Sequence, residues 1–233
     1  MSQNLFKWKH FEKEIILLCV RWYLKYPLSY RNLVDMMAER GLVLTHTTIM
    51  RWVHQYSPVI DEAIRKCLKQ TNDSWRMDET YIKIKGKDAY LYRAVDSDGN
   101  TIDFFVSEHR DKDAAKKFLR KALSARHNQQ PRVITTDKYG ATEVAIIEEQ
   151  YYGDISCETQ HRMTKYLNNI IEQDHRFIKR KVKPMLGFYS LETAEKTICG
   201  IEAMHMIRKG QVEEIRCVLS EVEFINKVMC EVA

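Results

Sequence analysis

The amino-acid sequence predicts an α/β protein, in which an all-α region precedes a mixed five-stranded sheet with helices. Three observations lead to this fold class. Apolar residues in the first 70 positions recur every three to four residues, the spacing of amphipathic helices. From Trp75 onward the apolar spacing changes to two, as in half-buried strands. Strand-like and helix-like segments then alternate as far as Lys181, which is typical of a sheet covered by helices.

Two short helices are predicted at the start of the chain. The first ends at Pro27, and its apolar positions are Phe11, Ile15, Leu18 and Trp22. Ser29 is a favourable N-cap for the second helix, and Gly41 is expected to stop it. The apolar stripe of the second helix is Leu33, Met36 and Met37.

A third helix is expected to follow, capped by Thr45 or Thr47. Its predicted buried face is Ile49, Trp52, Val53 and Tyr56. Ser57-Pro58 predicts the start of a fourth helix, because proline is favoured at the first helical position. Short helices joined by a glycine turn are typical of a helix-turn-helix domain, which we place at residues 1–70.

Charge supports DNA as a partner of this domain. Residues 1–70 hold eleven Lys or Arg against six Asp or Glu, a surplus of five positive charges. The exposed face of the third helix is expected to carry His46, Thr48 and Arg51, which can reach base edges or phosphates. A small helical bundle with solvated polar faces is the alternative, and the spacing alone leaves both open.

The second half of the chain predicts a sheet domain at residues 75–185. Its expected strands are Met77–Gly86, Ala89–Asp96, Thr101–Val106, 133–136 and 155–158, and its expected helices are 111–125, 140–150 and 165–181. Three antiparallel strands, helix, strand, helix, strand, helix is the ribonuclease-H-like order. Residues 186–233 are expected to form a C-terminal helical segment.

Three acidic residues lie on successive elements of this predicted sheet domain. Asp78 lies near the start of the first strand, Asp137 closes the fourth, and Glu172 lies in the last helix. Each has an ordinary interpretation by itself, as a surface strand residue, a helix cap or a solvated helical position. Together they predict a site for divalent cations, which prefer oxygen ligands. Two such ions ~4 Å apart can activate an attacking oxygen and stabilise a leaving one.

The helix around Glu172 adds a basic face. Helical spacing places five polar residues together: Asn168, Glu172, His175, Arg176 and Lys179. A basic run from Arg176 to Lys183 includes Arg180 and suits a phosphate backbone. The alternative is a solvated helix end, where cations also favour the helix dipole.

Three blocks of sequence carry a resemblance to a known family. MDETYIKIKGK, TTDKYGA and YLNNIIEQDHRFIKRK resemble the signature blocks of the bacterial insertion-sequence DDE transposases, and most closely the insertion sequence six family. The resemblance implies that Asp78, Asp137 and Glu172 hold two Mg²⁺ or Mn²⁺ ions, and that Lys179 contacts DNA near the element end. It also implies binding of terminal inverted repeats, 3′-end cleavage and strand transfer that joins element and target as a cointegrate.

Two other functions stay open at this stage. One is a non-catalytic helix-turn-helix regulator, and the other is a ribonuclease-H-like nuclease without strand transfer. Cys157 and His161 have a metal-ligand spacing, but no second pair accompanies them, so we reject a zinc site. The isolated histidines, His109 and His127, are expected on the surface or in loops.

The expected partner is double-stranded DNA, both element ends and target. A stripe along a C-terminal helix suggests a homodimer or a higher assembly, although the same helix can instead pack on its own sheet: Leu191, Ala194, Ile198, Ile201 and His205. No apolar run is long enough to cross a membrane. The six scattered cysteines are expected to be reduced and mostly buried, as in a bacterial cytoplasmic, nucleoid-associated protein.

Overall fold

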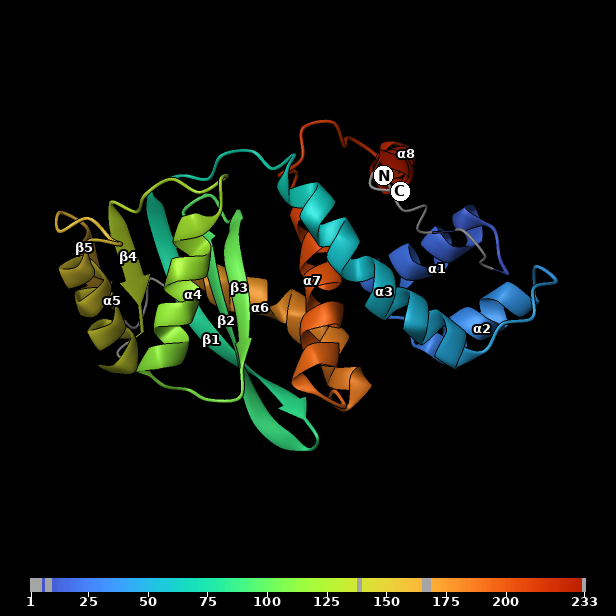
Figure 1. Cartoon of the computed structure of the whole chain (residues 1–233), viewed down its shortest axis with the longest axis horizontal. Coiled ribbons are helices and arrows are strands. Elements are labelled where there is room, and N and C mark those ends of the chain that lie inside the picture. The colour runs from blue at the N-terminus through green and yellow to red at the C-terminus, as the bar shows by residue number, and fades with distance from the viewer. Residues whose placement is uncertain (1–5, 7–9, 138–139, 165–168, 232–233) are drawn as a thin grey trace. The chain divides into compact units, whose positions relative to one another are not determined.

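The computed structural model describes residues 6, 10–137, 140–164 and 169–231, and the chain divides into two compact units (Figure 1). The helical unit comprises Met1–Leu68 and Glu195–Ala233. The sheet unit comprises Lys69–Ala194. The structure therefore groups most of the C-terminal helices with the N-terminal ones.

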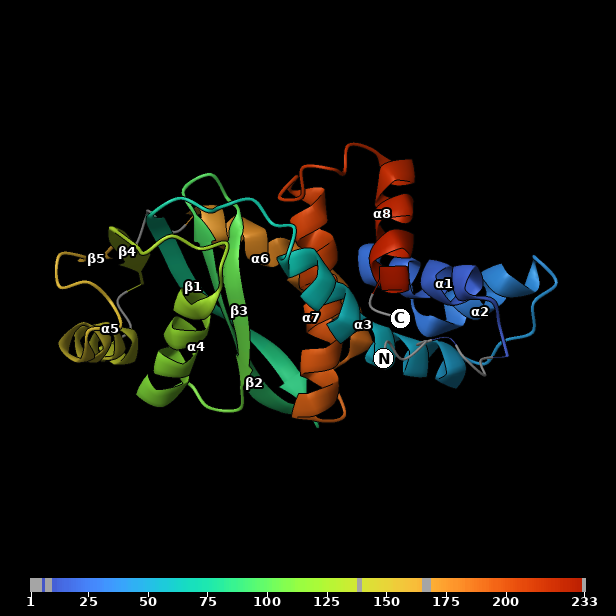
Figure 2. The ribbon, with the colours of Figure 1, turned by 45° about the horizontal axis from the view of Figure 1, so that its top comes forward.

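The helical unit contains the two ends of the chain. Its helices are α1 (Lys13–Lys25), α2 (Tyr30–Ala38), α3 (His46–Arg65), most of α7 (Leu191–Arg208) and α8 (Val218–Glu231). The last helix packs against α1 and α3 (Figure 2). Buried ion pairs join α1 to α8, because Glu221 lies 3.0 Å from Arg21 and 2.6 Å from Lys25.

The predicted caps of α2 and α3 are confirmed. Ser29 accepts a hydrogen bond from the Asn32 amide, and the Asn32 side chain accepts one from the Ser29 amide, which is a capping box. Gly41 follows α2 with φ +75°, a backbone conformation that favours glycine. The Thr45 hydroxyl accepts from the Thr48 amide at the start of α3.

The prediction of a fourth helix at Ser57-Pro58 is wrong, because α3 continues through Pro58 to Arg65. Proline removes one helical hydrogen bond and usually interrupts a helix. Here the apolar stripe does not stop at Pro58, and burying all of it in one helix favours continuation. The buried apolar positions are spaced three or four apart for most of the helix: Ile49, Trp52, Val53, Tyr56, Ile60, Ala63 and Ile64.

The predicted apolar face of α1 is also wrong. The four residues proposed for it are only half-buried: Phe11, Ile15, Leu18 and Trp22. The helix instead buries a neighbouring face that includes Ile16, Val20, Tyr23 and Leu24. Both sets have helical spacing, so the choice between them depends on how α1 packs against α3 and α8.

The sheet unit has the predicted ribonuclease-H-like fold. Its strands are β1 (Ser74–Ile84), β2 (Lys87–Asp96), β3 (Thr101–Ser107), β4 (Val133–Thr136) and β5 (Gln160–Met163), in the spatial order β3-β2-β1-β4-β5. The first three strands pair antiparallel, and β4 pairs parallel with both β1 and β5. Two parallel connections of this kind require helical crossovers.

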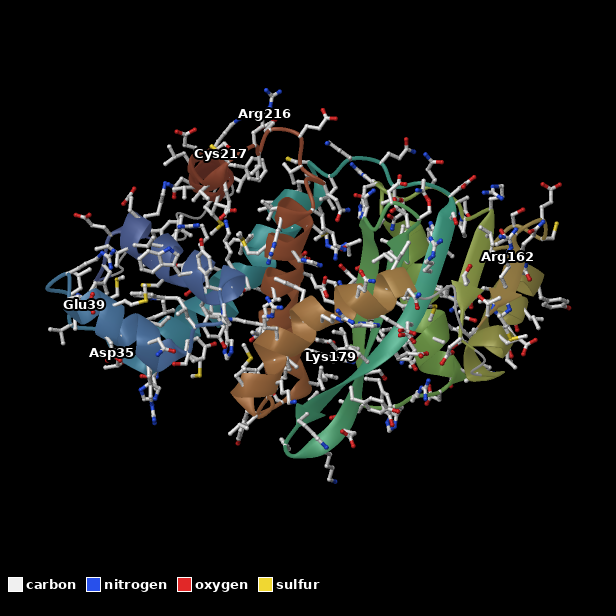
Figure 3. The ribbon with its side chains drawn as sticks, turned by 180° about the vertical axis from the view of Figure 1, so that it is seen from behind. Asp35, Glu39, Arg162, Lys179, Arg216 and Cys217 are labelled. Atoms are coloured by element: carbon white, nitrogen blue, oxygen red, sulfur yellow. The ribbon has the colours of Figure 1, made fainter. Side chains whose placement is uncertain are left out.

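Those crossovers cover the sheet. They are α4 (Lys112–Ser124), between β3 and β4, and α5 (Gly140–Tyr152), between β4 and β5. A third helix, α6 (Asn169–Val182), follows β5 and is followed by the short helix η1 (Lys183–Met185). The two faces of the sheet carry α4 and α6 respectively (Figures 1 and 3). The core under α4 and α5 is built around large apolar side chains: Trp75, Tyr92, Ile102, Phe118 and Ile134.

The fifth strand is β5, not the predicted segment 155–158. Ile155 is fully buried in the core, but it lies in a loop. The Thr159 amide donates to the Ser156 carbonyl, which closes a turn there. Pairing with β4 begins only at Gln160. Most residues of β5 are exposed, so the spacing of apolar residues could not have predicted this strand.

The stripe proposed for dimer contacts is buried within one chain. Ala194, Ile198 and Ile201 have no exposed surface, and His205 is also buried. Gly200 of α7 packs against Ser57 of α3, within the helical unit. None of the helices in the described part of the chain combines the length and apolar character needed to span a membrane.

The prediction that the cysteines are mostly buried is wrong for several of them. Cys19 is buried, whereas Cys67, Cys157 and Cys217 are exposed, and Cys199 is half-buried. These five are free thiols. His127 lies in the loop after α4, as one of its two predicted placements allows, and it is buried with Nε2 3.2 Å from the carbonyl oxygen of Ile102.

Candidate active site

The site begins at Asp78 on β1. Successive strand residues point to opposite faces of a sheet, so Asp78 and Glu79 point to different sides. Asp78 lies on the side of α6, where His175 Nε2 is 3.2 Å from Asp78 Oδ2. Directly across from Asp78 on β2 is Arg93, which is fully buried and whose Nη2 lies 2.7 Å from Asp174 Oδ2 of α6.

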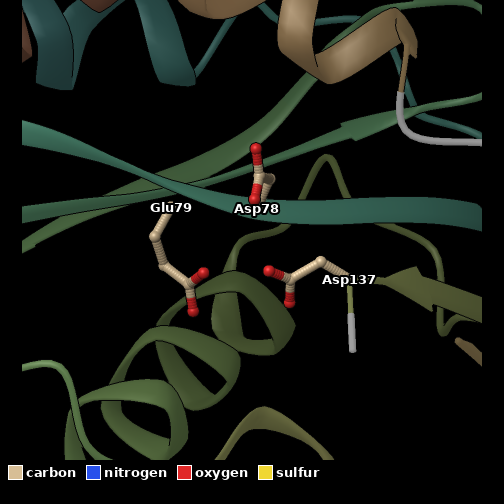
Figure 4. Close-up of side chains that lie close together, drawn as sticks. All are labelled: Asp78, Glu79 and Asp137. Carbon is tan, nitrogen blue, oxygen red and sulfur yellow. The ribbon is translucent and has the colours of Figure 1, made fainter. Parts of the chain in front are cut away.

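Asp137 enters the site from the neighbouring strand. It directly follows β4, which pairs parallel with β1. Asp78, Glu79 and Asp137 each offer a carboxylate oxygen, and these atoms lie within 4.8 Å of one another (Figure 4). Adjacent strands therefore bring together two of the three predicted acids.

Glu79 is a member of this cluster that sequence reasoning did not propose. Its side chain is nearly fully buried, with Oε2 3.3 Å from Arg110 Nη2 and Oε1 accepting from the Thr142 hydroxyl. Arg110 Nη2 also lies 3.6 Å from Asp137 Oδ2. Burial raises the pKa of Glu79, and the carboxylates of Asp137 and Asp78 act in the same direction while Arg110 opposes it.

No sequence signal singled out Arg110, which lies between β3 and α4. Its guanidinium lies within 3.6 Å of the carboxylates of both Glu79 and Asp137. An acidic residue beside Asp78 was visible in the sequence, but its burial depends on Thr142 and Arg110, which come from distant positions.

Glu172 lies in the first turn of α6 and is exposed. It is not part of the group of three acids within 4.8 Å, as far as the described residues go. It stands three positions, or about one helical turn, before His175, which contacts Asp78. The helix that carries Glu172 is thus docked over β1 at Asp78.

The predicted division of α6 into faces is corrected at His175. This residue was placed on the polar face with Glu172, but it is buried with Ile171 and Ile178. The neighbouring Asp174 is largely buried in its ion pair with Arg93. The fifth member of the predicted polar face, Asn168, lies outside the described residues.

The basic candidates on α6 are accessible. Arg176, Lys179 and Arg180 are all exposed, and Lys179 projects from the helix in Figure 3. Lys181 belongs to the same run but is buried, and desolvation lowers its pKa to about 7.

The candidates on α3 lie in its first two turns. His46 and Arg51 are exposed, whereas Thr48 is half-buried and its hydroxyl lies 2.9 Å from that of Thr45. The predicted absence of zinc at Cys157 and His161 remains a prediction. In the described chain His161 Nε2 lies 2.8 Å from the Thr136 hydroxyl.

The donor chemistry of the cluster fits a hard divalent cation. Asp78, Glu79 and Asp137 present only oxygen atoms, and Mg²⁺ and Mn²⁺ favour carboxylate ligands. Glu79 is nearly fully buried and engaged by both Arg110 and the Thr142 hydroxyl, which leaves the more exposed Asp78 and Asp137 as the better candidates for ligands.

The sheet unit has the ribonuclease-H-like fold, and residues 72–211 match the family model described as a DDE domain. The chain belongs to the DDE transposases of insertion sequences of the IS431 and IS257 type, in the insertion sequence six family. It is therefore an enzyme, and the resemblance predicted from the three sequence blocks is confirmed.

Two relatives from Staphylococcus aureus illustrate the similarity. The chain is 39% identical over 207 residues to the transposase for insertion sequence-like element IS431mec, covering 88% of this chain and 89% of the relative. The identity and coverage are the same for the transposase for insertion sequence element IS257 in transposon Tn4003. Among solved structures, the HTLV-2 integrase catalytic core domain in complex with magnesium is 18% identical, with a TM-score of 0.43 over 57% of this chain and 84% of that one.

Proposed function

We propose that this transposase binds the terminal inverted repeats of its insertion sequence, cleaves DNA at the 3′ ends of the element and transfers those ends into target DNA. The observation that carries the proposal is the convergence of Asp78 and Asp137 from neighbouring strands, with the helix of Glu172 docked over Asp78. Cointegrate formation, which joins element and target, is the expected product.

The reaction consists of two displacements at phosphorus. Water attacks the phosphodiester at the element end, so one P–O bond forms, another breaks and a 3′-hydroxyl is released. That hydroxyl then attacks a target phosphodiester, and the number of phosphodiester bonds is conserved. Asp78, Asp137 and Glu172 would hold two Mg²⁺ or Mn²⁺ ions, which supply activation of the attacking oxygen and stabilisation of the leaving one.

Other residues bind and orient the DNA. Arg176, Lys179 and Arg180 present cations on the open side of α6 for the phosphate backbone. Arg51, His46 and Thr48 of α3 are the proposed contacts to the inverted repeat. We accordingly assign end recognition to residues 1–70 and chemistry to residues 75–185, and treat 186–233 as a C-terminal helical segment.

The proposed setting is bacterial DNA in the cytoplasm, at the nucleoid. Joining two element ends to one target favours a homodimer or a higher assembly on DNA, because each chain has one cluster of candidate ligands among its described residues. Glu79 and Arg110 are proposed to support Asp137 rather than to act on the substrate.

Two substitutions test the chemistry directly. Asp137→Asn and Glu172→Gln keep side-chain size but remove the negative charge, which weakens binding of a hard cation. We expect both to lose cleavage and strand transfer by on the order of a thousandfold or more, since several kcal/mol of barrier stabilisation is lost. Gel-shift affinity for the element end should stay within about twofold. Glu158→Gln, an exposed carboxylate outside the cluster, is the matched control.

A pre-cut element end separates the proposal from its alternatives. Joined product with wild-type protein supports a strand-transferring enzyme. Hydrolysis without joining supports the nuclease, and binding without either reaction supports the regulator. Near wild-type joining by Glu172→Gln would show that the third ligand is misassigned.

A further inference from the structure

The hairpin that joins β1 to β2 ends in an exposed basic tip, next to the turn that follows η1. We propose that these two segments form a second DNA-binding surface, which takes the phosphate backbone of duplex DNA. We call it the tip surface, and it consists of Lys83, Lys85, Lys87, Lys183 and Tyr189. The inference rests on the proposed function, because it assumes that DNA lies across the candidate active site.

Backbone hydrogen bonds build the tip surface from two distant segments. The Lys85 amide donates to the Phe188 carbonyl at 2.8 Å, and the Phe188 amide donates to the Lys83 carbonyl at 2.7 Å. Gly187 has φ +116°, and a Cβ there would lie 2.8 Å from both Cβ and the carbonyl oxygen of Lys83. Only glycine permits this approach, so the hairpin tip is held in place by the turn.

The side chains of the tip surface are cationic and aromatic. All four lysines are exposed. Asp88 pairs with Lys83 at 2.8 Å, whereas the other three lysines form no ion pair within the described part of the chain. Tyr189 is 83% exposed, and Lys85 Nζ lies 5.8 Å from its ring centroid. An exposed aromatic ring among lysines suits nucleic acid, which offers phosphates for the cations and sugars or bases for the ring.

The tip surface continues the basic side of α6. Arg176, Lys179 and Arg180 are followed by Lys183, the first residue of η1, and the chain then reaches the turn at Gly187. The distance along α6 from Glu172 to Lys183 is about 16 Å at 1.5 Å per residue. One line of cations therefore leads from the candidate active site to the hairpin.

The length of β1 sets the expected position on DNA. Lys85 follows Asp78 by seven positions, which corresponds to roughly 23 Å at 3.3 Å per residue. Since base pairs repeat every 3.4 Å, the tip surface should contact phosphates about seven base pairs from the reacting phosphodiester. A solvated hairpin tip with no ligand is the alternative that the experiment must exclude.

The test uses full-length protein and a labelled duplex carrying one element end. The variants are Lys85→Gln/Lys87→Gln and, separately, Tyr189→Ala. The control is Lys117→Gln/Lys227→Gln, which removes the same charge from exposed positions of α4 and α8. Affinity is measured over a salt series, and contacts are mapped by hydroxyl-radical footprinting. Thermal melts establish that each variant is folded.

We expect the double tip variant to lower the slope of log affinity against log salt by about two, because each phosphate contact contributes about 0.9. Protection about seven base pairs from the cleavage position should disappear, while protection over the inverted repeat persists. Tyr189→Ala should lose the same protection with little change in slope. The control should match the wild type in both measurements.

An unchanged slope and footprint in the double tip variant would overturn the inference, as would equal losses in the control. The outcome is separable from that of the proposed function. If wild-type protein neither cleaves nor joins DNA, the proposed function fails, whereas the tip surface is judged on the footprint alone.

Discussion

At the scale of single residues, the contact between His175 and Asp78 connects α6 to the carboxylate cluster. His175 is buried, and its Nε2 lies 3.2 Å from Asp78 Oδ2. A buried neighbour limits the directions in which a carboxylate can point, and groups that orient ligands in this way tune metal affinity. If Asp78 is a metal ligand, as proposed, we expect His175 to act as a positioning residue through it.

Replacing His175 by alanine should weaken binding of Mn²⁺ to the free protein by about 10- to 100-fold, the range typical for partners of metal ligands. Isothermal titration with Mn²⁺ alone measures this without DNA, and gel shift should show unchanged end binding. His175→Asn, which can still contact Asp78, should restore part of the affinity. Equal Mn²⁺ affinity in His175→Ala and wild type would contradict the positioning role.

Lys181 gives stability a pH dependence. Burial lowers its pKa to about 7 in the folded protein, against roughly 10.4 in an unfolded chain. Between these values the unfolded state binds more protons, so the contribution of Lys181 to stability rises with pH. Lys181→Met should be more stable than the wild type at pH 7, by on the order of a few kcal/mol, with the advantage shrinking toward pH 10. Denaturant unfolding of both proteins at several pH values measures the difference in their unfolding free energies. A difference that does not change with pH would refute the prediction.

At the scale of elements, packing between helices depends on a single small residue of α7. A Cβ at Gly200 would lie 2.6 Å from Ser57 Cβ and 2.7 Å from a methyl carbon of Leu24. Glycine within a helix usually costs stability, so its presence here follows from the close approach of α3 and α1. The same contact lies beside Pro58, where α3 remains helical.

Gly200→Ala should destabilise the protein by about 1–3 kcal/mol, the usual cost of overpacking. Gly140→Ala is the matched control, because Gly140 also lies in a helix but has no atom within 4 Å of the added Cβ. The control should be neutral or more stable by up to about 1 kcal/mol. Chemical denaturation of both variants gives the comparison, and a stable Gly200→Ala protein would refute the packing argument.

At the scale of the whole molecule, the helical unit is discontinuous in sequence. Residues 1–68 and 195–233 form one compact unit, joined by the buried contacts of Glu221 with Arg21 and Lys25. Removing one partner of a buried ion pair leaves an uncompensated charge. The N-terminal helices therefore depend on the C-terminal ones for part of their core.

A fragment of residues 1–70 alone should lack a cooperative thermal transition. Co-expression with residues 195–233 should restore one, because it returns the apolar surface of α7 and α8 together with Glu221. Circular dichroism melts of the fragment and of the co-purified pair provide the measurement. A cooperative transition in the isolated fragment, at the temperature of the pair, would show that residues 1–70 fold independently.

The sequence by itself determined the order of strands and helices in the sheet unit, the cap at Ser29 and the family, and it narrowed the cap of α3 to Thr45 or Thr47. These features are local, because turn residues, N-caps and apolar periods act over a few positions. The three sequence blocks are also contiguous in the chain. Asp78 and Asp137 could be proposed as neighbours from the order of the strands that carry them, while the parallel pairing of β1 with β4 came only from the structure.

The tertiary structure alone decided which of several equivalent patterns is buried. It placed His175 on the inner side of α6, continued α3 through Pro58, moved the fifth strand to Gln160 and brought Arg110 between Glu79 and Asp137. Burial and charge pairing join residues far apart in the chain. Their free energy depends on the neighbours that folding supplies, which a periodic pattern does not contain.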